Sequence, residues 1–232
     1  MNRIVILTGA GVSAESGLGT FRDTGGIWSQ YDLEEVATPQ GFARNPGLVH
    51  EFYNARRANM LAAAPNAAHL ALARLQAEFA GEVLIVTQNI DDLHERAGSR
   101  AVLHMHGQLT GGLCAACGHR WPAPRVMAAR TPCPGCQAQN TRPDIVWFGE
   151  MPYHLDQIGA ALARADLFVS LGTSGEVYPA AGFVDQARAA GVATLEINLE
   201  PSARPGRFDR VITGPATQAV PAWVCEVIAQ TA

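Results

Sequence analysis

Two pairs of cysteines in one short segment have the spacing of a metal site. Cys114 and Cys117 form one C-x-x-C pair, and Cys133 and Cys136 form a second pair after an interval of 15 residues. This arrangement is typical of tetrahedral zinc, because each pair brings two thiolates together on a tight turn. Four sulfur ligands leave no open position for water, so we expect a structural zinc. His119 could replace one cysteine as a ligand.

A glycine-rich turn follows the first apolar strand, in the stretch IVILTGAGVSAESGLGTFR. Gly9, Gly11 and Ala14 fit the G-x-G-x-x-G/A pattern of a dinucleotide-binding turn. Glycine lets the backbone approach a pyrophosphate closely, and the N–H groups that open a following helix point at the phosphates. Any tight turn between a strand and a helix would also satisfy this pattern. The ribose-binding acid of dehydrogenases has no clear counterpart, because no second strand precedes Asp23.

Polar residues follow the apolar stretch VLIVT, where we expect a strand to end. They are Gln88, Asn89 and Asp91. Ligands of an open α/β sheet bind at the carboxyl ends of its strands, so these side chains are candidates for a binding site. The alternative is a helix cap made by Asn89 or Asp91.

Two further stretches end in the same way. The sequence GTS at 172–174 follows LFVSL, and Asn198 and Glu200 follow the body of ATLEIN. A glycine with two hydroxyls suits close approach to a phosphate or ribose. An acidic group such as Glu200 can accept hydrogen bonds from ribose hydroxyls.

Two of the seven histidines, His104 and His106, end a predicted strand immediately before Gly107. A spacing of two places both side chains on one face of a strand. A metal pair is one interpretation, although no third ligand is evident nearby. A histidine whose pKa lies near neutrality is also suited to removing a proton from a ribose hydroxyl.

A predicted helix over 46–63 carries Tyr53 and Arg56 on one face, because they lie three residues apart. A guanidinium and a phenol together make a sound receptor for a carboxylate. The alternative is a solvent-exposed helix face that carries Tyr53, Arg56 and Arg57.

The order of elements predicts an α/β fold, a Rossmann-like parallel sheet with a smaller zinc-binding and helical domain inserted. We expect strands at 3–8, 83–87, 101–105, 144–148, 167–171, 192–197 and 209–213. We expect helices at 11–18, 46–63, 66–79, 155–165, 179–190 and 217–230. The Rossmann-like part is predicted to comprise 1–23, 66–107 and 144–232. The small domain is predicted to comprise a helical insert at 24–65 and a zinc module at 108–143, above the carboxyl edge of the sheet.

The composition indicates a globular protein and excludes several classes. Of 232 residues, 48% are hydrophobic and 16% are charged, and the net charge of −4 argues against nucleic acid as a ligand. No apolar run approaches the length of about 18 residues that would indicate a membrane span. The chain enters a strand at once, which predicts no signal peptide and a cytoplasmic location. The cysteines fit a cytosolic metal site better than a disulfide framework, and Cys225 is predicted to be a core thiol.

Six motifs, in this order over nearly the whole chain, resemble the sirtuin family of NAD-dependent protein lysine deacylases. They are GAGVSAESGLGTFRD at 9–23, TQNID at 87–91, HMHG at 104–107, WFGE at 147–150, GTS at 172–174 and NLE at 198–200. The resemblance is to the bacterial type and the class III branch. It implies NAD as a co-substrate, one structural zinc and acylated lysine in a protein or peptide as the substrate. It implies no nucleic-acid or membrane partner.

The resemblance also implies roles for individual residues. The general base is the histidine before the glycine, His106. Substrate peptide pairs by strand addition along the edge that contains Val146, Phe148, Gly149 and Glu150. The residues that would contact NAD are Gly9, Ala10, Gly11, Ala14, Phe21, Arg22, Trp28, Gln88, Asn89, Ile90, Asp91, Gly172, Thr173, Ser174, Asn198, Leu199, Glu200 and Ala216.

In the class III branch, a Tyr-x-x-Arg pair recognises a carboxylate at the end of the acyl chain. Tyr53 and Arg56 match that pair, the small Ala37 leaves room for the acyl group, and the family pattern does not use Arg57. We therefore predict removal of succinyl, malonyl and acetyl groups from lysine, with release of nicotinamide and O-acyl-ADP-ribose. One alternative is an NAD-dependent protein ADP-ribosyltransferase. A second is a zinc-ribbon binding module that senses NAD.

Overall fold

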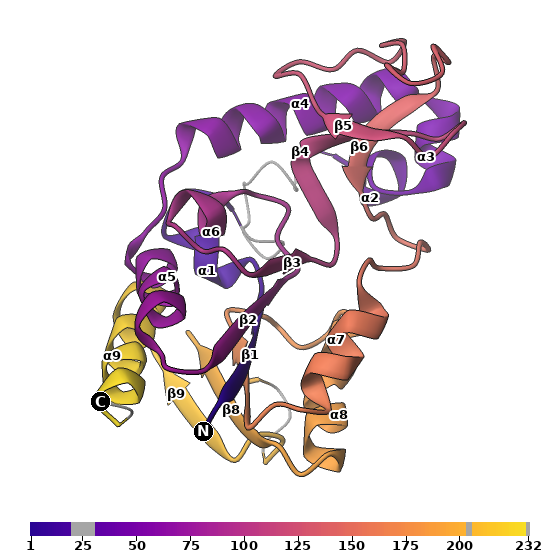
Figure 1. Ribbon diagram of the computed structural model, residues 1–232. Coiled ribbons are helices and arrows are strands. Elements are labelled where there is room, and N and C mark those ends of the chain that lie inside the picture. Colours follow the sequence, from indigo (N-terminus) through magenta and orange to yellow (C-terminus); the bar gives the residue numbers. More distant parts are fainter. Residues whose placement is uncertain (20–30, 203–205, 231–232) are drawn as a thin grey trace.

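The computed structural model describes residues 1–19, 31–202 and 206–230 (Figure 1). Within that part of the chain, six parallel strands form a sheet in the order β3-β2-β1-β7-β8-β9. Chain order reverses between β1 and β7, as in a Rossmann-like sheet. The predicted fold class is confirmed. The strands are β1 (Arg3–Thr8), β2 (Glu82–Thr87), β3 (Val102–His104), β7 (Leu167–Leu171), β8 (Ala193–Asn198) and β9 (Arg210–Thr213).

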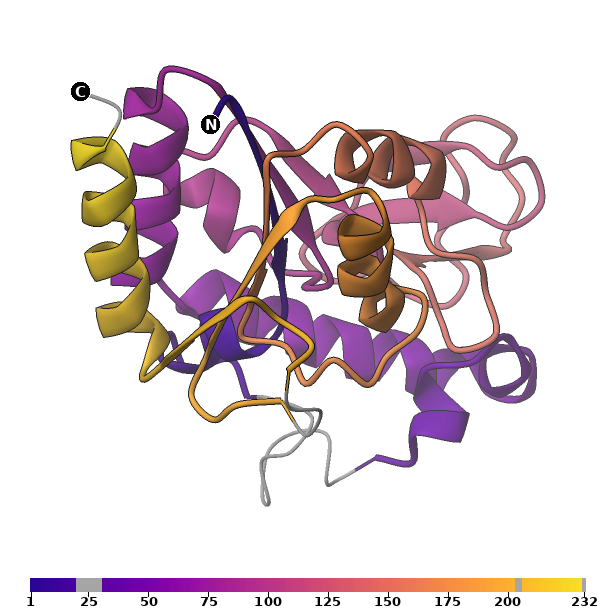
Figure 2. The same cartoon turned by 90° about the horizontal axis from the view of Figure 1, so that it is seen from below.

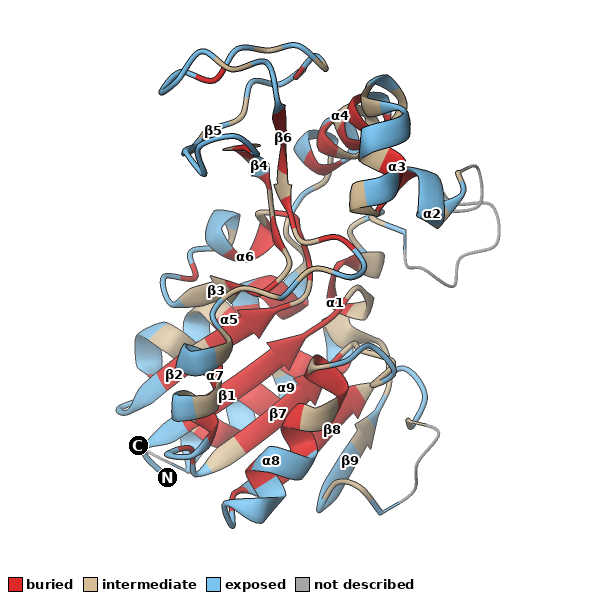
Figure 3. Ribbon diagram, turned by 90° about the vertical axis from the view of Figure 1, so that its right-hand side faces the viewer, coloured by how far each residue is buried: buried red, intermediate tan, exposed pale blue. Residues whose placement is uncertain are grey.

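Helices cover both faces of this sheet, so the central strands are apolar on both sides (Figure 3). Side chains alternate along β1: Ile4 and Ile6 pack on one face, and Val5 and Leu7 on the other. The first face is covered by α5 (Ala67–Glu78) and α9 (Ala216–Ala229), which lie side by side (Figure 2). The second face is covered by α7 (Leu155–Leu162), the 3-10 helix η2 (Ala180–Gly182) and α8 (Phe183–Ala189).

A second, smaller group of elements lies beyond the carboxyl ends of the parallel strands (Figure 1). Its antiparallel sheet has the order β5-β4-β6 and packs against helices. Side chains of both groups meet in one apolar cluster that includes Ile90, Leu109 and Trp147. The elements are α2 (Leu33–Val36), α3 (Pro39–Arg44), α4 (Pro46–Ala62), β4 (Gly107–Cys114), β5 (Arg120–Pro122) and β6 (Thr141–Ile145). Two one-turn helices, α1 (Gly11–Ala14) and α6 (Leu93–Arg96), follow β1 and β2.

The long helix α4 begins where its sequence predicts. The Asn45 side chain accepts a hydrogen bond from the Leu48 amide at 3.1 Å, and Pro46 occupies the first turn. An asparagine cap followed by proline is a strong start signal for a helix. This start fixes which residues of α4 face the antiparallel sheet of β4 and β6.

Several predicted elements differ from the structure. The strand expected at 144–148 is β6, which ends at Ile145 and pairs with β4 in the antiparallel sheet. Residues 108–143 contain most of β4, which is rich in glycine, and all of β5, which has only three residues, so neither strand shows a clear hydrophobic period. The helix expected at 11–18 ends at Ala14. The short helices α2, α3 and α6 were not predicted, and the proposed domain boundaries stay a prediction.

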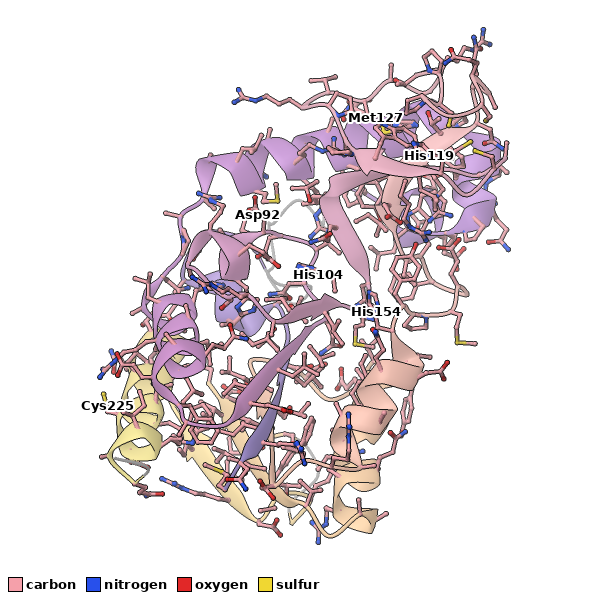
Figure 4. All side chains as sticks on the ribbon, viewed as in Figure 1. Asp92, His104, His119, Met127, His154 and Cys225 are labelled. Atoms are coloured by element: carbon pink, nitrogen blue, oxygen red, sulfur yellow. The ribbon has the colours of Figure 1, made fainter. Side chains whose placement is uncertain are left out.

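Cys225 is exposed, so the prediction of a core thiol is wrong. Helix α9 turns Val220, Trp223 and Val224 toward the sheet, and Cys225 therefore faces outward (Figure 4). Its sulfur lies 3.7 Å from an Nη1 atom of Arg74. Within the described residues, no helix is both long and apolar enough to cross a membrane.

Candidate active site

The glycine turn after β1 locks against the end of β7, at the point where the strand order reverses. The Gly9 amide donates to the Leu171 carbonyl at 3.0 Å, and the Gly11 amide donates to the Gly172 carbonyl at 2.8 Å. A Cβ atom on Gly11 would lie 2.8 Å from the Gly172 Cα atom, and Gly172 has a φ of +60°. Close approach of two backbones therefore requires glycine at both positions. Ligands of open α/β sheets bind at this point of the fold.

Several amides of this turn are engaged within the chain. Val12 donates to the Gly9 carbonyl at 3.1 Å, and Ser13 donates to the Ala10 carbonyl at 3.1 Å. Helix α1 has a single turn, so its dipole is small. The helix that the sequence predicts over 11–18 is therefore shorter, and the amides of Gly9, Gly11, Val12 and Ser13 have partners within the chain. The glycine turn still offers a surface without bulky side chains for a dinucleotide, which stays a prediction.

The polar residues after β2 form a buried network with the glycine turn. The Asn89 Nδ2 donates to the Gly9 carbonyl and to the Ser13 hydroxyl, both at 3.1 Å. The Ser13 hydroxyl donates in turn to the Asp91 carboxylate at 3.1 Å. Burial raises the pKa of Asp91, and hydrogen bonds from Leu93 and Ser13 oppose the rise. Sequence reasoning overlooked Ser13, whose hydroxyl joins the two predicted residues.

The helix-cap alternative is partly correct for this segment. The Leu93 amide donates to Asp91 Oδ1 at 3.1 Å, which is an Asx turn before α6. Asn89 does not cap a helix, because its side chain is directed to the glycine turn. The second Asp91 oxygen still faces Ser13, so capping uses only half of the carboxylate.

The ends of β2, β7 and β8 are joined by side-chain hydrogen bonds. The Gln88 Nε2 donates to the Thr173 hydroxyl at 3.0 Å, and the Asn198 Nδ2 donates to the Thr173 carbonyl at 2.9 Å. Ser174 follows, and its hydroxyl accepts from the Glu176 amide at 3.3 Å. The structure thus brings three of the predicted NAD motifs to one sheet edge.

Other predicted cofactor residues lie further along the same edge. Leu199 and Glu200 are exposed beyond the end of β8, and Ala216 opens α9, where it packs on the sheet. Ile90 is buried between the sheet and the small domain. The predicted residues Phe21, Arg22 and Trp28 lie outside the described part of the chain.

His106 lies just beyond β3, and its ring is anchored by one hydrogen bond. The Nδ1 atom lies 3.1 Å from the Gln88 carbonyl oxygen. A carbonyl can only accept, so Nδ1 carries the proton and Nε2 holds the lone pair. Burial lowers the pKa of His106, and the Gln88 hydrogen bond opposes the shift. The ring is therefore neutral at pH 7, in the form that a general base requires.

His104 is engaged at both ring nitrogens. Its Nδ1 lies 3.2 Å from the Asn89 carbonyl, and its Nε2 lies 2.8 Å from a Glu95 carboxylate oxygen. The ring is buried near the centre of the molecule (Figure 4). Both ring nitrogens therefore have partners, the Asn89 carbonyl and the Glu95 carboxylate, so neither is left for a metal. These contacts fit a structural role for His104.

The segment after β6 connects the base to the small domain. The Val146 amide donates to the His106 carbonyl at 2.9 Å, and the Phe148 amide donates to the Ala37 carbonyl at 3.0 Å. The Phe148 side chain is 52% exposed, and Gly149 has a φ of +86°. These bonds fix residues 146–148 between His106 and Ala37, and the peptide-binding role of this segment stays a prediction.

The pair on α4 is directed inward. Tyr53 is buried in the apolar cluster of the small domain, and Arg56 is partly buried. Burial raises the pKa of Tyr53 to about 12, and it lowers the pKa of Arg56 to about 10, against the opposing influence of Tyr53 and Asp91. At pH 7 the site therefore holds one neutral phenol and one cation.

The alternative of a solvent-exposed helix face is wrong. Arg57 is buried, and its Nε donates to the Leu109 carbonyl at 2.7 Å while its Nη1 donates to Asn54 at 2.8 Å. These bonds tie α4 to β4. Arg57 therefore supports the small domain.

The four paired cysteines gather at one point, with all four sulfur atoms within 4.8 Å of one another. Cys114 Sγ lies 3.7 Å from Cys136 Sγ, and Cys117 Sγ lies 3.8 Å from Cys133 Sγ. A tetrahedron with Zn–S bonds of about 2.3 Å has edges of about 3.8 Å, so the cluster fits a structural zinc. In the described part of the chain it is the one group of three or more His, Cys, Asp or Glu side chains with that geometry.

A Rossmann-like sheet with a nucleotide-type turn, joined to a four-cysteine zinc module, defines the class of protein. The model of the Sir2 family matches residues 9–179. The chain is 60% identical to an NAD-dependent protein deacylase of Caulobacter vibrioides, over 98% of both chains. It is 53% identical to the NAD-dependent protein deacylase SIR2rp3 of Trypanosoma brucei brucei, over 97% of this chain and 94% of the relative. The chain belongs to the Sir2 family, and the sirtuin resemblance is confirmed.

Solved structures agree with this assignment. A Sir2 homologue in complex with NAD is 38% identical, with a TM-score of 0.90, over 99% of this chain and 91% of that chain. A Sir2 mutant with a deacetylated p53 peptide and 3'-O-acetyl ADP ribose is 30% identical, with a TM-score of 0.78, over 98% of this chain and 92% of that chain. NAD and a structural zinc are the cofactors that the family and the site define.

Proposed function

We propose that this protein is an NAD-dependent protein lysine deacylase that prefers acyl groups ending in a carboxylate, such as succinyl and malonyl, and also accepts acetyl. NAD-dependent protein deacylation is the activity named for relatives at 52 to 60% identity. The acidic-acyl preference rests on one observation: Tyr53 and Arg56 lie one turn apart on α4, with Tyr53 buried in the apolar cluster and Arg56 partly buried.

The charge state of the pair suits a carboxylate. The pKa of Arg56 stays well above 7, and the pKa of Tyr53 rises further, so one cation and one neutral donor are present at pH 7. Burial excludes competing water, and a charge-assisted hydrogen bond is stronger in such a site. An acetyl group has no carboxylate to use this pair.

We assign proton transfer to His106. When bound, NAD supplies an electrophilic ribose carbon and the ribose hydroxyl that receives the acyl group. His106 Nε2 accepts the proton of that hydroxyl, and the Gln88 carbonyl holds the opposite nitrogen protonated. The network of Asn89, Ser13 and Asp91 holds its polar groups in place beside the glycine turn, which limits reorganisation when the co-substrate binds.

The test is mass spectrometry of matched acetyl, succinyl and malonyl peptides incubated with the protein and NAD. The chain contains no lysine, since all 17 of its basic residues are arginines, so every acyl-lysine signal belongs to the peptide. We expect free lysine, nicotinamide and O-acyl-ADP-ribose, formed faster from succinyl and malonyl peptides. ADP-ribose attached to protein would favour the transferase alternative. Equal turnover of the three peptides would contradict the acidic preference.

A further inference from the structure

We propose that Trp147 is a positioning residue that turns the Tyr53 hydroxyl into a hydrogen-bond donor aimed at the acyl carboxylate. This inference rests on the proposed function, because it assumes that Tyr53 faces the acyl group. Trp147 is the one residue of the WFGE motif that sequence reasoning left without a role.

The indole and the phenol meet in the core of the small domain. Trp147 Nε1 lies 3.0 Å from Tyr53 Oη, and the two residues are only 3% and 2% exposed. An indole N–H can only donate, so the phenol oxygen must accept that bond. Its own proton is then directed elsewhere, and among the described residues no acceptor contacts the hydroxyl. A buried donor directed in this way requires an acceptor, and the carboxylate of an acidic acyl chain would supply one.

The indole itself is held rigidly. The Arg142 guanidinium lies 3.3 Å from the centre of the Trp147 ring, and Arg142 binds both oxygens of Glu150 at 2.6 and 2.9 Å. The Trp147 amide donates to the same Glu150 carboxylate at 2.8 Å. A stacked cation and a fixed backbone leave the ring little freedom to rotate.

This arrangement reassigns Glu150. Sequence reasoning placed it among the substrate-binding residues, but its carboxylate is occupied by Arg142 and the Trp147 amide. Glu150 holds the loop that carries Val146 and Phe148, the residues predicted to lie at the peptide edge. One segment therefore sets both the peptide edge and, through Trp147, the direction of the Tyr53 proton. The geometry predicts that peptide position and acyl-group selection are coupled.

The first test is Trp147→Phe, which keeps an aromatic ring for Arg142 and removes the N–H. Without that bond the Tyr53 hydroxyl can rotate away, so we expect KM for a succinyl peptide to rise about 2- to 10-fold, the value of one neutral hydrogen bond. We expect kcat on succinyl and both constants on acetyl to stay near wild type. Trp121→Phe is the matched control, since Trp121 lies on β5 and stacks on His119; it should change neither substrate.

The decisive test is a double-mutant cycle with Tyr53→Phe. If Trp147 acts through the phenol, Trp147→Phe has no further effect on succinyl KM once the hydroxyl is absent. Additive effects, or equal losses on acetyl and succinyl, would overturn the proposal. Should Trp147→Phe not fold, benzothienylalanine at position 147 replaces the N–H by sulfur in a ring of the same shape, and the same outcomes apply. If the wild-type protein turns over succinyl peptide no faster than acetyl peptide, the proposed acyl preference is wrong. If that preference is found but the effects of the two substitutions are additive, only the role of Trp147 is wrong.

Discussion

The parallel sheet and the small domain are stabilised in different ways. The sheet has two extensive apolar clusters, one under α5 and α9 and the other under α7 and α8. The small domain has one smaller cluster, together with the four-cysteine site, the bonds of buried Arg57 and the pair of Arg142 and Glu150. Apolar burial increases with size, and small units need metals or specific polar contacts.

On the proposed function, this difference separates the reacting groups from the groups that select the substrate. The proposed general base and the predicted NAD residues lie at or just beyond the ends of strands in the parallel sheet. The proposed acyl pair and peptide edge lie on elements of the small domain, which has the smaller apolar cluster and the four-cysteine site. A change in the small domain can therefore alter substrate choice while the reacting groups keep their positions.

Loss of the zinc should have the largest effect. Structural zinc contributes on the order of 10 kcal/mol to folding in small domains, so Cys133→Ala should remove the metal, most soluble protein and all activity. Elemental analysis of the wild type should find one zinc per chain. Cys225→Ala is the matched control, because that thiol is exposed and away from the cluster. Folded, active protein without zinc would show that the small domain supports itself.

Replacing the base should remove chemistry and leave the sheet intact. We expect His106→Tyr to lower kcat about 10²- to 10⁴-fold on every acyl peptide, while the thermal midpoint and NAD binding change little. His154→Asn, an exposed histidine with a φ of 63°, is the control. Burial lowers the pKa of His106, so the acid limb of wild-type kcat/KM should lie below pH 6.5. Near-normal turnover in the variant would exclude His106 as the base.

Acid should lower the free energy of unfolding through two buried histidines, His69 and His94. Burial lowers the pKa of His69 to about 4 and of His94 to about 3, and their rings lie 5.0 Å apart. The unfolded chain then binds protons first as pH falls below 6.5, so the free energy of unfolding should drop by up to about 1.4 kcal/mol per pH unit for each histidine. Above pH 7 these two histidines should leave the free energy of unfolding independent of pH. Urea unfolding at pH 7, 6 and 5 measures this slope.

His94→Gln should make that slope shallower, because it removes one of the two buried imidazoles. His154→Asn should leave it unchanged. An equal slope in the His94 variant would mean that other groups control acid unfolding.

The sequence predicts the parallel sheet well because its signals are local. The strand RIVILT is apolar on both faces, and α4 starts at an asparagine cap with proline. The cysteine spacing likewise predicts the cluster of sulfur atoms. By contrast, β4 depends on pairing with the distant β6, and β5 is a three-residue strand that forms only by pairing with β4.

The missed site residues depend on tertiary contacts as well. Ser13 is an ordinary helix serine until Asn89 and Asp91 reach it from β2. Trp147 and Arg142 form a unit only once β6 and the following loop are folded. The exposed position of Cys225 follows from which face α9 turns to α5 and the sheet, and an apolar helix sequence leaves that face undetermined.

The most direct test of the acidic-acyl preference is the ratio of kcat/KM for matched succinyl and acetyl peptides, measured on the wild type and on Arg56→Met. A charge-assisted hydrogen bond contributes about 1.5–3 kcal/mol, so the variant should lose about 10- to 150-fold on succinyl and keep its acetyl activity. Arg44→Met is the control, since Arg44 is an exposed arginine of the same domain. A collapse of the ratio confined to Arg56→Met is the predicted result. Equal losses on both peptides would mean that Arg56 only supports the fold, and the acidic-acyl assignment would be wrong.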